Sequence, residues 1–389
     1  MRCSRSLAAL TAAMLFIVYS GCGAGEGKKD SGSTGSGGAT QAKAGDKAGG
    51  QTASAAVKGA IDFSLVTPDH FAAIVIHPRR LSASPLVAEK LKDEKIAEAI
   101  KKFGLDPSEV EQIVVLLSMD EKQPGNSEPI PVIVTRFTHD VDAKEVLTKI
   151  QAASAKKESK PIKEVTVAGK TCFDLGGEKN AGLAYALSKN TIVLTVKENM
   201  GKVLAGNEPK GPLYERLKKA STDNDLIVAV ELEKYPGLDK QIDAAKAGAP
   251  PMGQNYLDGA KTLRGVTLGL SLTGDSLLQI VMETKDAAGA ETVETLLKDG
   301  VKLLDGALAG FKQNVPKEAK ADFADAFKLG DEALAGVSVT KSGSAVTIVL
   351  KRPASMDKIG PLVDKAIQRT MMGMVPQQKP MVLPPQDEK

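Results

Sequence analysis

The chain has 389 residues, of which 42% are hydrophobic and 25% are charged, values typical of a globular protein. Its 51 basic and 48 acidic residues leave a formal net charge of +3, which argues against a dedicated nucleic-acid binder. Aromatic residues make up only 4% and tryptophan is absent, which removes the usual stacking platforms for single-stranded nucleic acid. We therefore expect no nucleic-acid partner.

The first 22 residues form an export signal by their pattern. Arg2 and Arg5 precede an apolar run from Leu7 to Val18, which is followed by Tyr19-Ser20-Gly21-Cys22. A run of roughly 12 apolar residues has the length of a signal-peptide core and is too short to cross a bilayer as a helix. We predict a lipoprotein signal in which Cys22 is the acylated residue. Ordinary secretion with a free Cys22 is the alternative.

Residues 23–60 are mostly Gly, Ser, Ala, Thr, Gln and Lys, with no large aliphatic residue before Val57. A segment of this composition can bury too little apolar surface to offset the conformational entropy lost on folding, so we predict a flexible tether. A coil of this length spans about 30–35 Å, enough to hold a folded part clear of a lipid surface. Beyond the tether Cys172 is the only cysteine. One thiol forms no internal disulfide, so packing must hold the fold together.

In residues 61–206 we expect a strand at Phe71–Ile76 and a helix that begins after Ser84-Pro85 and reaches Gly104. Two further strands, Val110–Ser118 and Ile130–Phe137, should pair antiparallel. Asp142 and Glu145 resemble a capping box, which predicts a helix. Two further segments, Glu164–Asp174 and Leu183–Val196, are β-rich. A turn at Gly169-Lys170 breaks the first and a turn at Lys189-Asn190 breaks the second.

Residues 207–375 repeat this order of elements. We predict a strand at Leu226–Leu232 and a broken helical region at Gly237–Leu263. A hairpin of Val266–Thr273 and Leu277–Thr284 follows, and then an amphipathic helix at Val293–Phe311. The last predicted elements are a second hairpin, Val337–Thr340 with Ala345–Leu350, and a helix from about Met356. In Val266–Thr273 apolar and polar residues alternate, which favours an apolar face that is packed and a polar face that is solvated or lightly covered.

We therefore expect an α+β fold of two tandem ferredoxin-like halves, each of βαββαβ type, with antiparallel sheets covered by helices. The halves would span residues 61–206 and 207–375, and residues 376–389 would form a disordered, proline-rich tail. Only the order of the elements supports the repeat, because residue identities do not match between the halves.

Two groups of residues are candidates for contact with a ligand or partner. His77, Arg79 and Arg80 stand at the end of the first predicted strand, where a basic cluster could meet a phosphate or a headgroup; a solvated loop is the plainer interpretation. The methionines Met371, Met372 and Met374 follow the last predicted helix and could form an adaptable binding surface or simply close the edge of a core.

No pattern indicates catalysis, a cofactor or a metal. Gly169-Lys170-Thr171 ends like a phosphate-binding loop, but Glu164 stands where the first glycine is needed, so we predict a hairpin turn. His70 and His77 should face opposite ways on one strand. His139 lacks a ligand pattern, and Cys172 lies in an apolar strand where cysteine is usually a buried hydrophobe.

With Gly21-Cys22, the tether and two similar α+β halves, the chain resembles uncharacterised bacterial envelope lipoproteins. The resemblance implies a lipid-anchored protein of the cell envelope. Gly23, after the acylated cysteine, implies the outer membrane, with the protein facing the periplasm. A soluble secreted form is the alternative. We expect a non-catalytic binding or scaffolding module. The alternative is a carrier for a lipid or other apolar ligand, and a hydrolytic enzyme is a distant third.

Overall fold

The structure is a computed structural model that describes residues 63–92, 98, 100, 105–119, 129–154, 161–176, 182–206, 208–220, 222–235, 237–317 and 320–359. The predicted signal, tether and tail, with Cys22, Met371, Met372 and Met374, lie outside the described residues. None of the helices in the described part combines the length and the apolar character that a membrane-spanning helix requires.

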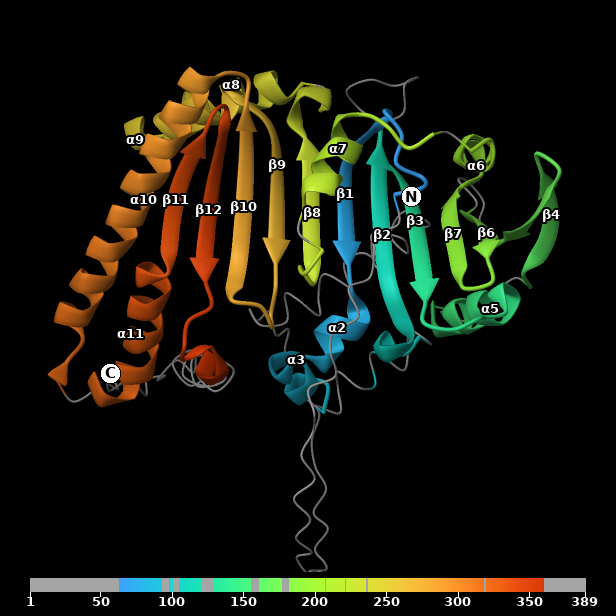
Figure 1. Cartoon of the computed structure of the whole chain (residues 1–389), viewed down its shortest axis with the longest axis horizontal. Helices are drawn as coiled ribbons and strands as arrows, with labels where there is room; N and C mark the ends of the chain where they lie inside the picture. Colours follow the sequence, from blue (N-terminus) through green and yellow to red (C-terminus); the bar gives the residue numbers. More distant parts are fainter. Residues whose placement is uncertain are drawn as a thin grey trace, which may run out of the picture.

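The described residues build one twelve-stranded sheet in which each strand pairs antiparallel with its neighbours (Figure 1). From one edge to the other the strands follow the order β11-β12-β10-β9-β8-β1-β2-β3-β7-β6-β5-β4. Their bounds are β1 His70–Ile76, β2 Val110–Ser118, β3 Ile130–Phe137, β4 Lys163–Val167, β5 Lys170–Asp174, β6 Gly182–Ser188, β7 Thr191–Val196, β8 Leu226–Glu231, β9 Leu263–Leu270, β10 Ser276–Thr284, β11 Val337–Ser342 and β12 Ala345–Lys351.

Helices connect many of these strands. The α-helices are α2 Pro78–Ala83, α3 Pro85–Lys90, α5 Ala143–Ser154, α6 Lys197–Leu204, α7 Pro212–Lys219, α8 Leu238–Gly248, α9 Pro251–Lys261, α10 Ala287–Asn314 and α11 Lys320–Ala335. The predicted caps are present: the Ser84 side chain accepts from the Val87 amide, and Asp142 accepts from Glu145. Short 3-10 turns add η1 Pro107–Glu109, η2 Leu232–Lys234 and η4 Met356–Lys358.

The two halves share a strand order, counted outward from the middle of the sheet. On one side it is β1-β2-β3-β7-β6 and on the other β8-β9-β10-β12-β11. β1 and β8 are antiparallel neighbours, with Ile74 opposite Val228, so the halves meet in one continuous sheet. Chain order and sheet order thus both repeat around this β1–β8 seam.

The expected ferredoxin-like halves need correction. In a split βαβ unit, the strands on either side of a helix run parallel with another strand between them. Here β1 and β2 flank helices α2 and α3 yet are direct antiparallel neighbours. Helices α2 and α3 are short and lie at the end of the strands, so the chain returns beside β1 instead of crossing over the sheet (Figure 1). The predicted α+β class with antiparallel pairing is confirmed. The halves do not have separate sheets, because their strands belong to one continuous sheet.

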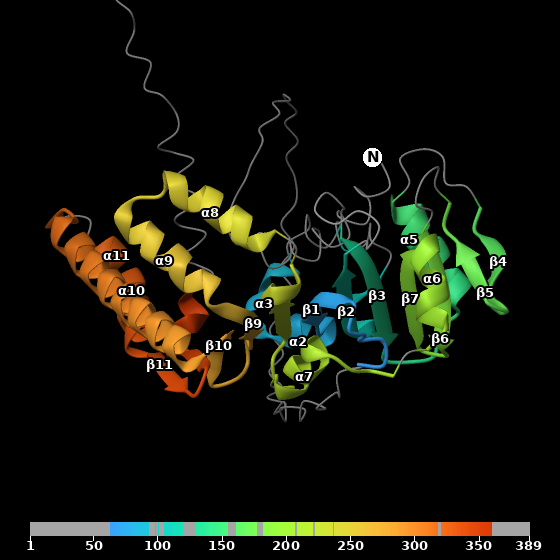
Figure 2. The same cartoon turned by 90° about the horizontal axis from the view of Figure 1, so that it is seen from above.

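Both faces of the sheet carry helices, as Figure 2 shows. On one face, which we call face A, α7 packs over the middle strands, with Leu213 and Leu217 buried among Val75, Val114 and Ile227. On the opposite face, face B, α5 covers the first half, where Leu147 is buried among Val115 and Ile133. Helices α8, α9 and α10 lie on face B of the second half (Figure 2).

Candidate functional site

The predicted basic cluster at the end of β1 does not form one exposed patch. His77 is the residue before α2 and is buried, and burial lowers its pKa to about 4, so its ring is neutral at pH 7. Arg80 donates to the carbonyls of Thr222 and Asn224. Of the three predicted residues only Arg79 is exposed. His77 is therefore enclosed and not part of an exposed patch, whereas a phosphate or headgroup contact at Arg79 and Arg80 stays a prediction.

The residues of this cluster instead attach α2 to the start of β8. The Arg80 Nε atom lies 3.5 Å from Asp225 Oδ1, and the His77 amide donates to the Asp225 carbonyl at 2.9 Å. Burial raises the pKa of Asp225, whose other carboxylate oxygen accepts from the Leu272 amide. These contacts hold three chain segments together, which is a structural role.

The remaining predicted residues are placed as follows. Val167 and Lys170 flank the β4–β5 turn, where Ala168 and Gly169 have positive φ, so the predicted hairpin is confirmed. Cys172 is fully buried, and burial raises its thiol pKa. The His139 ring lies next to Thr138, and in the described residues no group of three or more His, Cys, Asp or Glu side chains could hold a metal ion.

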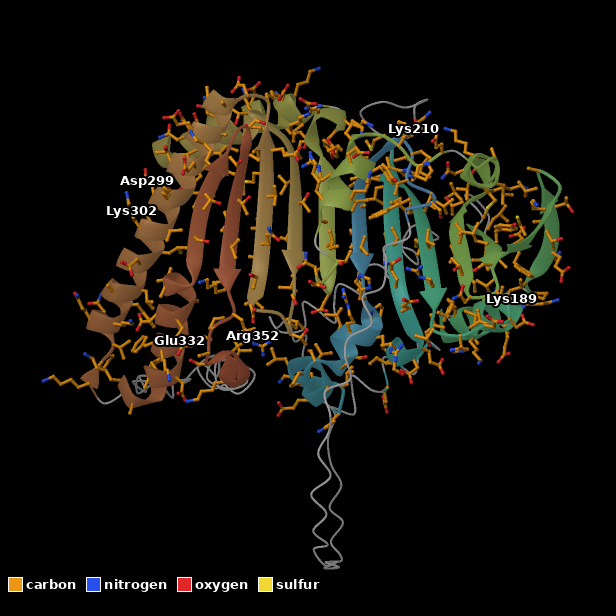
Figure 3. All side chains as sticks on the ribbon, viewed as in Figure 1. Lys189, Lys210, Asp299, Lys302, Glu332 and Arg352 are labelled. Atoms are coloured by element: carbon orange, nitrogen blue, oxygen red, sulfur yellow. The ribbon has the colours of Figure 1, made fainter. Side chains whose placement is uncertain are left out.

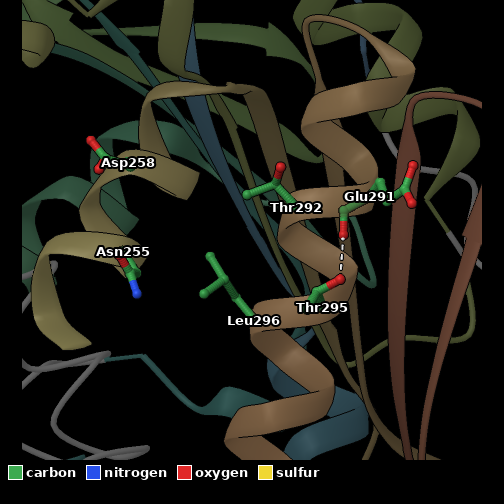
Figure 4. A pocket seen from close by; sticks show the side chains of 6 residues that line it. All are labelled: Asn255, Asp258, Glu291, Thr292, Thr295 and Leu296. Atoms are coloured by element: carbon green, nitrogen blue, oxygen red, sulfur yellow. Dashed lines mark hydrogen bonds between the residues drawn. The ribbon is translucent and has the colours of Figure 1, made fainter. Parts of the chain in front are cut away.

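A hollow of about 390 Å³ lies between α9 and α10. It is lined by Asn255, Asp258, Glu291, Thr292, Thr295 and Leu296 (Figure 4). The Thr295 hydroxyl donates to the Glu291 carbonyl of its own helix, and Asp258 is paired with Lys246 at 2.6 Å. No nucleophile and base are hydrogen-bonded to each other among these six residues, so the hollow lacks the geometry of nucleophilic catalysis.

The distinctive surface of the molecule is face B of the second half. A row of opposed side chains crosses the strands here: Val228 pairs with Leu268, Leu268 with Ile280, and Ile280 with Ile348. The next row, nearer the end of the sheet where α2 and α3 lie, contains Leu270, Leu278, Leu350 and Val337. We call these eight side chains the apolar face.

All eight side chains of the apolar face are only half-buried. None of them belongs to, or packs against, the buried clusters that the described residues form. The same central row continues into the first half through Ile74, Val115 and Ile133, where Val115 and Ile133 are buried under α5. The sheet is therefore covered on face B of one half and left partly open on the other.

Burial along β9 is the reverse of the predicted one. The polar side chains Thr267 and Ser271 are buried, whereas Leu268 and Leu270 on the other face are only half-buried. Glycines explain the buried side, because the Arg216 guanidinium from α7 lies directly over Gly265 and the Asn224 amide lies over Gly269. The solvated polar face expected from the alternation is thus wrong.

Charge and hydrogen bonding complete the cover on face A. Arg216 is buried and its Nε lies 2.7 Å from Glu231 Oε1, while its terminal nitrogen lies 3.1 Å from Glu283 Oε2. This ion pair connects α7 to β8 and β10. The glycines of β9 indicate such a contact in the sequence, because a strand without side chains at these positions lets a large side chain approach its backbone.

Helix α10 adds to the open apolar surface. Its apolar stripe begins buried against the sheet, with Ala290 and Val293 among the packed residues. Further along the same helix face Leu304 is 62% exposed, and Phe311 is 51% exposed although its ring touches Phe323. The predicted stripe is thus present, but only its first part is covered.

Neither a family model nor a curated protein sequence matches this chain. The chain is similar to solved structures of TP0453. Crystal form I overlaps 79% of this chain and 98% of that chain, with a TM-score of 0.37 and 7% identity. Crystal form III overlaps 79% and 99%, with a TM-score of 0.39 and 7% identity. At such low TM-scores the likeness gives no basis for assigning a function.

Proposed function

We propose that this protein is a membrane-anchored, non-catalytic binding module that holds an amphipathic helix of a partner protein on its apolar face. The anchor would be the acylated Cys22, in the cell envelope. The observation that supports the proposal is the reversed burial of β9, where Leu268 and Leu270 are only half-buried while Thr267 is buried. Covering the part of one such aliphatic side chain that is still exposed is worth about 0.5 kcal/mol, so a partner that covered all eight would gain a few kcal/mol.

The dimensions of the apolar face favour a helix as the occupant. Strands lie about 4.8 Å apart, so the five strands from β8 to β11 give a face about 20 Å across. A helix about 10 Å wide matches its two rows of side chains, and about 13 residues span its width. A single acyl chain would leave much of so broad a surface wet. An open face also fits a docked segment better than a carried ligand, which needs enclosure.

The experiment is site-specific photo-crosslinking in cells that produce the protein. A photoreactive residue replaces Ile280 on the apolar face, and the matched control replaces Val281, which points to face A on the same strand. We expect Ile280 to give one discrete protein adduct whose crosslinked peptide has an amphipathic helical pattern. The adduct should disappear when Leu268→Asn is added, while the thermal midpoint of the protein changes little.

Other outcomes decide against this function. An adduct to lipid instead of protein would show that the module is a carrier for an apolar ligand. Equal crosslinking at Ile280 and Val281 would show that the apolar face has no particular partner, and the proposed function would then be discarded.

A further inference from the structure

We propose that the helix held on the apolar face is α10 of a second copy of this chain, so that two copies form a reciprocal dimer. Each copy lays the second half of its α10, residues 300–314, on the apolar face of the other. This inference rests on the proposed function, because it names the partner that the apolar face holds.

The second half of α10 carries most of the exposed large apolar side chains. Among the described residues these side chains are Leu187, Tyr256, Leu303, Leu304 and Phe311. The last three, with the exposed Ala307, fall within about 100° of one side of the helix, and we call them the exposed stripe. Asp299 and Lys302 pair with each other at 3.2 Å, and Figure 3 shows them on the side of α10 that is turned away from the sheet. This half of α10 is therefore amphipathic.

The chain itself covers only part of this half of α10. Leu308 lies close to Gly330 of α11, and the ring of Phe311 touches Phe323 of the same helix. The second half of α10 runs outside the edge strand β11 (Figure 1). Leu304 remains 62% exposed and Leu303 50% exposed. Apolar side chains that gather in the open on one side of a helix mark a surface for protein contact.

The exposed stripe and the apolar face fit each other in size. The fifteen helical residues 300–314 extend about 22 Å, and the apolar face is about 20 Å across. Ala307 is small, and Gly310 beside it has open space where a side chain would be. The branched side chains Ile280 and Ile348 of the face can therefore come close to the helix backbone at these positions.

The area that such a contact buries favours a reciprocal dimer over a single contact. A helix of this length, about 10 Å wide, removes roughly 700 Å² of accessible surface on the apolar face, counting both partners. Stable interfaces begin at about 1,200 Å². Every copy has both the helix and the face, so a two-fold axis repeats the contact and brings the buried area to roughly 1,400 Å². Two reciprocal contacts thus reach the size that one contact lacks.

The first test compares two substitutions in the purified full chain. Ala307→Asp places a charge in the exposed stripe, and Ala309→Asp places the same charge on the polar side of α10; both alanines are exposed. Sedimentation velocity over a dilution series should show a dimer whose Kd rises about tenfold or more with Ala307→Asp, because the carboxylate would be buried without a partner. Ala309→Asp should leave the Kd unchanged. Both variants should keep the thermal midpoint of the diluted parent chain.

The second test identifies the contact by photo-crosslinking. A photoreactive residue replaces Ile280 in unlabelled chains, which are mixed with heavy-isotope-labelled chains that lack it. The adduct should contain the labelled tryptic peptide of residues 303–312, which lies between two lysine cleavage sites. The control with the photoreactive residue at Val281 should not give this adduct.

Three results would overturn this inference: a chain that is monomeric at every concentration, a dimer that both aspartate variants weaken equally, and an Ile280 adduct without residues 303–312. Its failure is distinguishable from failure of the proposed function. If Ile280 crosslinks to a helix of another protein in cells while the purified chain is monomeric, the binding module stands and only the second copy is removed as its partner. An Ile280 adduct to lipid would remove both.

Discussion

At the scale of single residues, two buried histidines make the free energy of unfolding depend on pH. His70 accepts from the Thr67 amide at Nδ1, and His77 is enclosed where α2 begins. Burial lowers the pKa of each from 6.5 to about 4. In the unfolded chain both rings take up a proton near pH 6.5, whereas the folded chain resists it until about pH 4.

Stability should therefore be complete above about pH 6.5 and decline as the pH falls from there towards pH 4. The loss is at most about 3 kcal/mol per histidine. Urea unfolding at pH 7.5, 5.5 and 4.5 measures it. His77→Gln should flatten the decline relative to the parent chain. A free energy of unfolding that rises on acidification would contradict the explanation.

At the scale of elements, the close approach of α7 to β9 depends on a missing side chain. A Cβ atom at Gly265 would lie 2.1 Å from an Arg216 nitrogen and 2.7 Å from the Val230 carbonyl oxygen. The backbone oxygen cannot move aside, so the helix or the strand would have to shift. The buried ion pair of Arg216 with Glu231 would be strained by that shift.

We expect Gly265→Ala to lower the free energy of unfolding by about 2–3 kcal/mol, as overpacking does in cores. Gly306→Ala is the matched control, since Gly306 lies inside α10 with open space around it. That change should raise stability by about 1 kcal/mol through helix propensity. Denaturant titration of both variants checks the signs, and a Gly265→Ala variant as stable as the parent would show that the strand yields without cost.

The sequence predicted elements well where a local signal exists. Apolar runs of strand length placed β2 and β3 at their observed bounds, and the Ser84 and Asp142 caps marked α3 and α5. It did not predict α2, α6, α7 and α11, of which α2 and α7 begin at a proline. Strand order and the open apolar face were not predictable, because they depend on which distant segments pair and which helix covers which face.

At the scale of the whole molecule, the β1–β8 seam joins the halves into one packing unit. Val75 and Val114 of the first half share a buried cluster with Ile227 of β8 and Leu217 of α7. Removing either half would expose this cluster along its length. The halves should therefore not melt independently, although each has its own strand set.

Calorimetry of the full chain should show a single unfolding transition whose calorimetric and van't Hoff enthalpies agree. Ala229→Asp, which places a charge in the seam, should lower the midpoint of the whole transition without splitting it. Two resolved transitions in the parent chain would show that the seam is weaker than its packing indicates.

The seam has a further consequence while the chain is being synthesised. The last strand of the first half, β7, ends at Val196, while β8 begins only at Leu226. In that interval β1 has a bare backbone edge with apolar residues on both sides, the kind of edge that recruits other strands. Until β8 is synthesised and pairs with it, this edge of β1 is open to a strand of a neighbouring copy, so slow synthesis of the second half would favour oligomers.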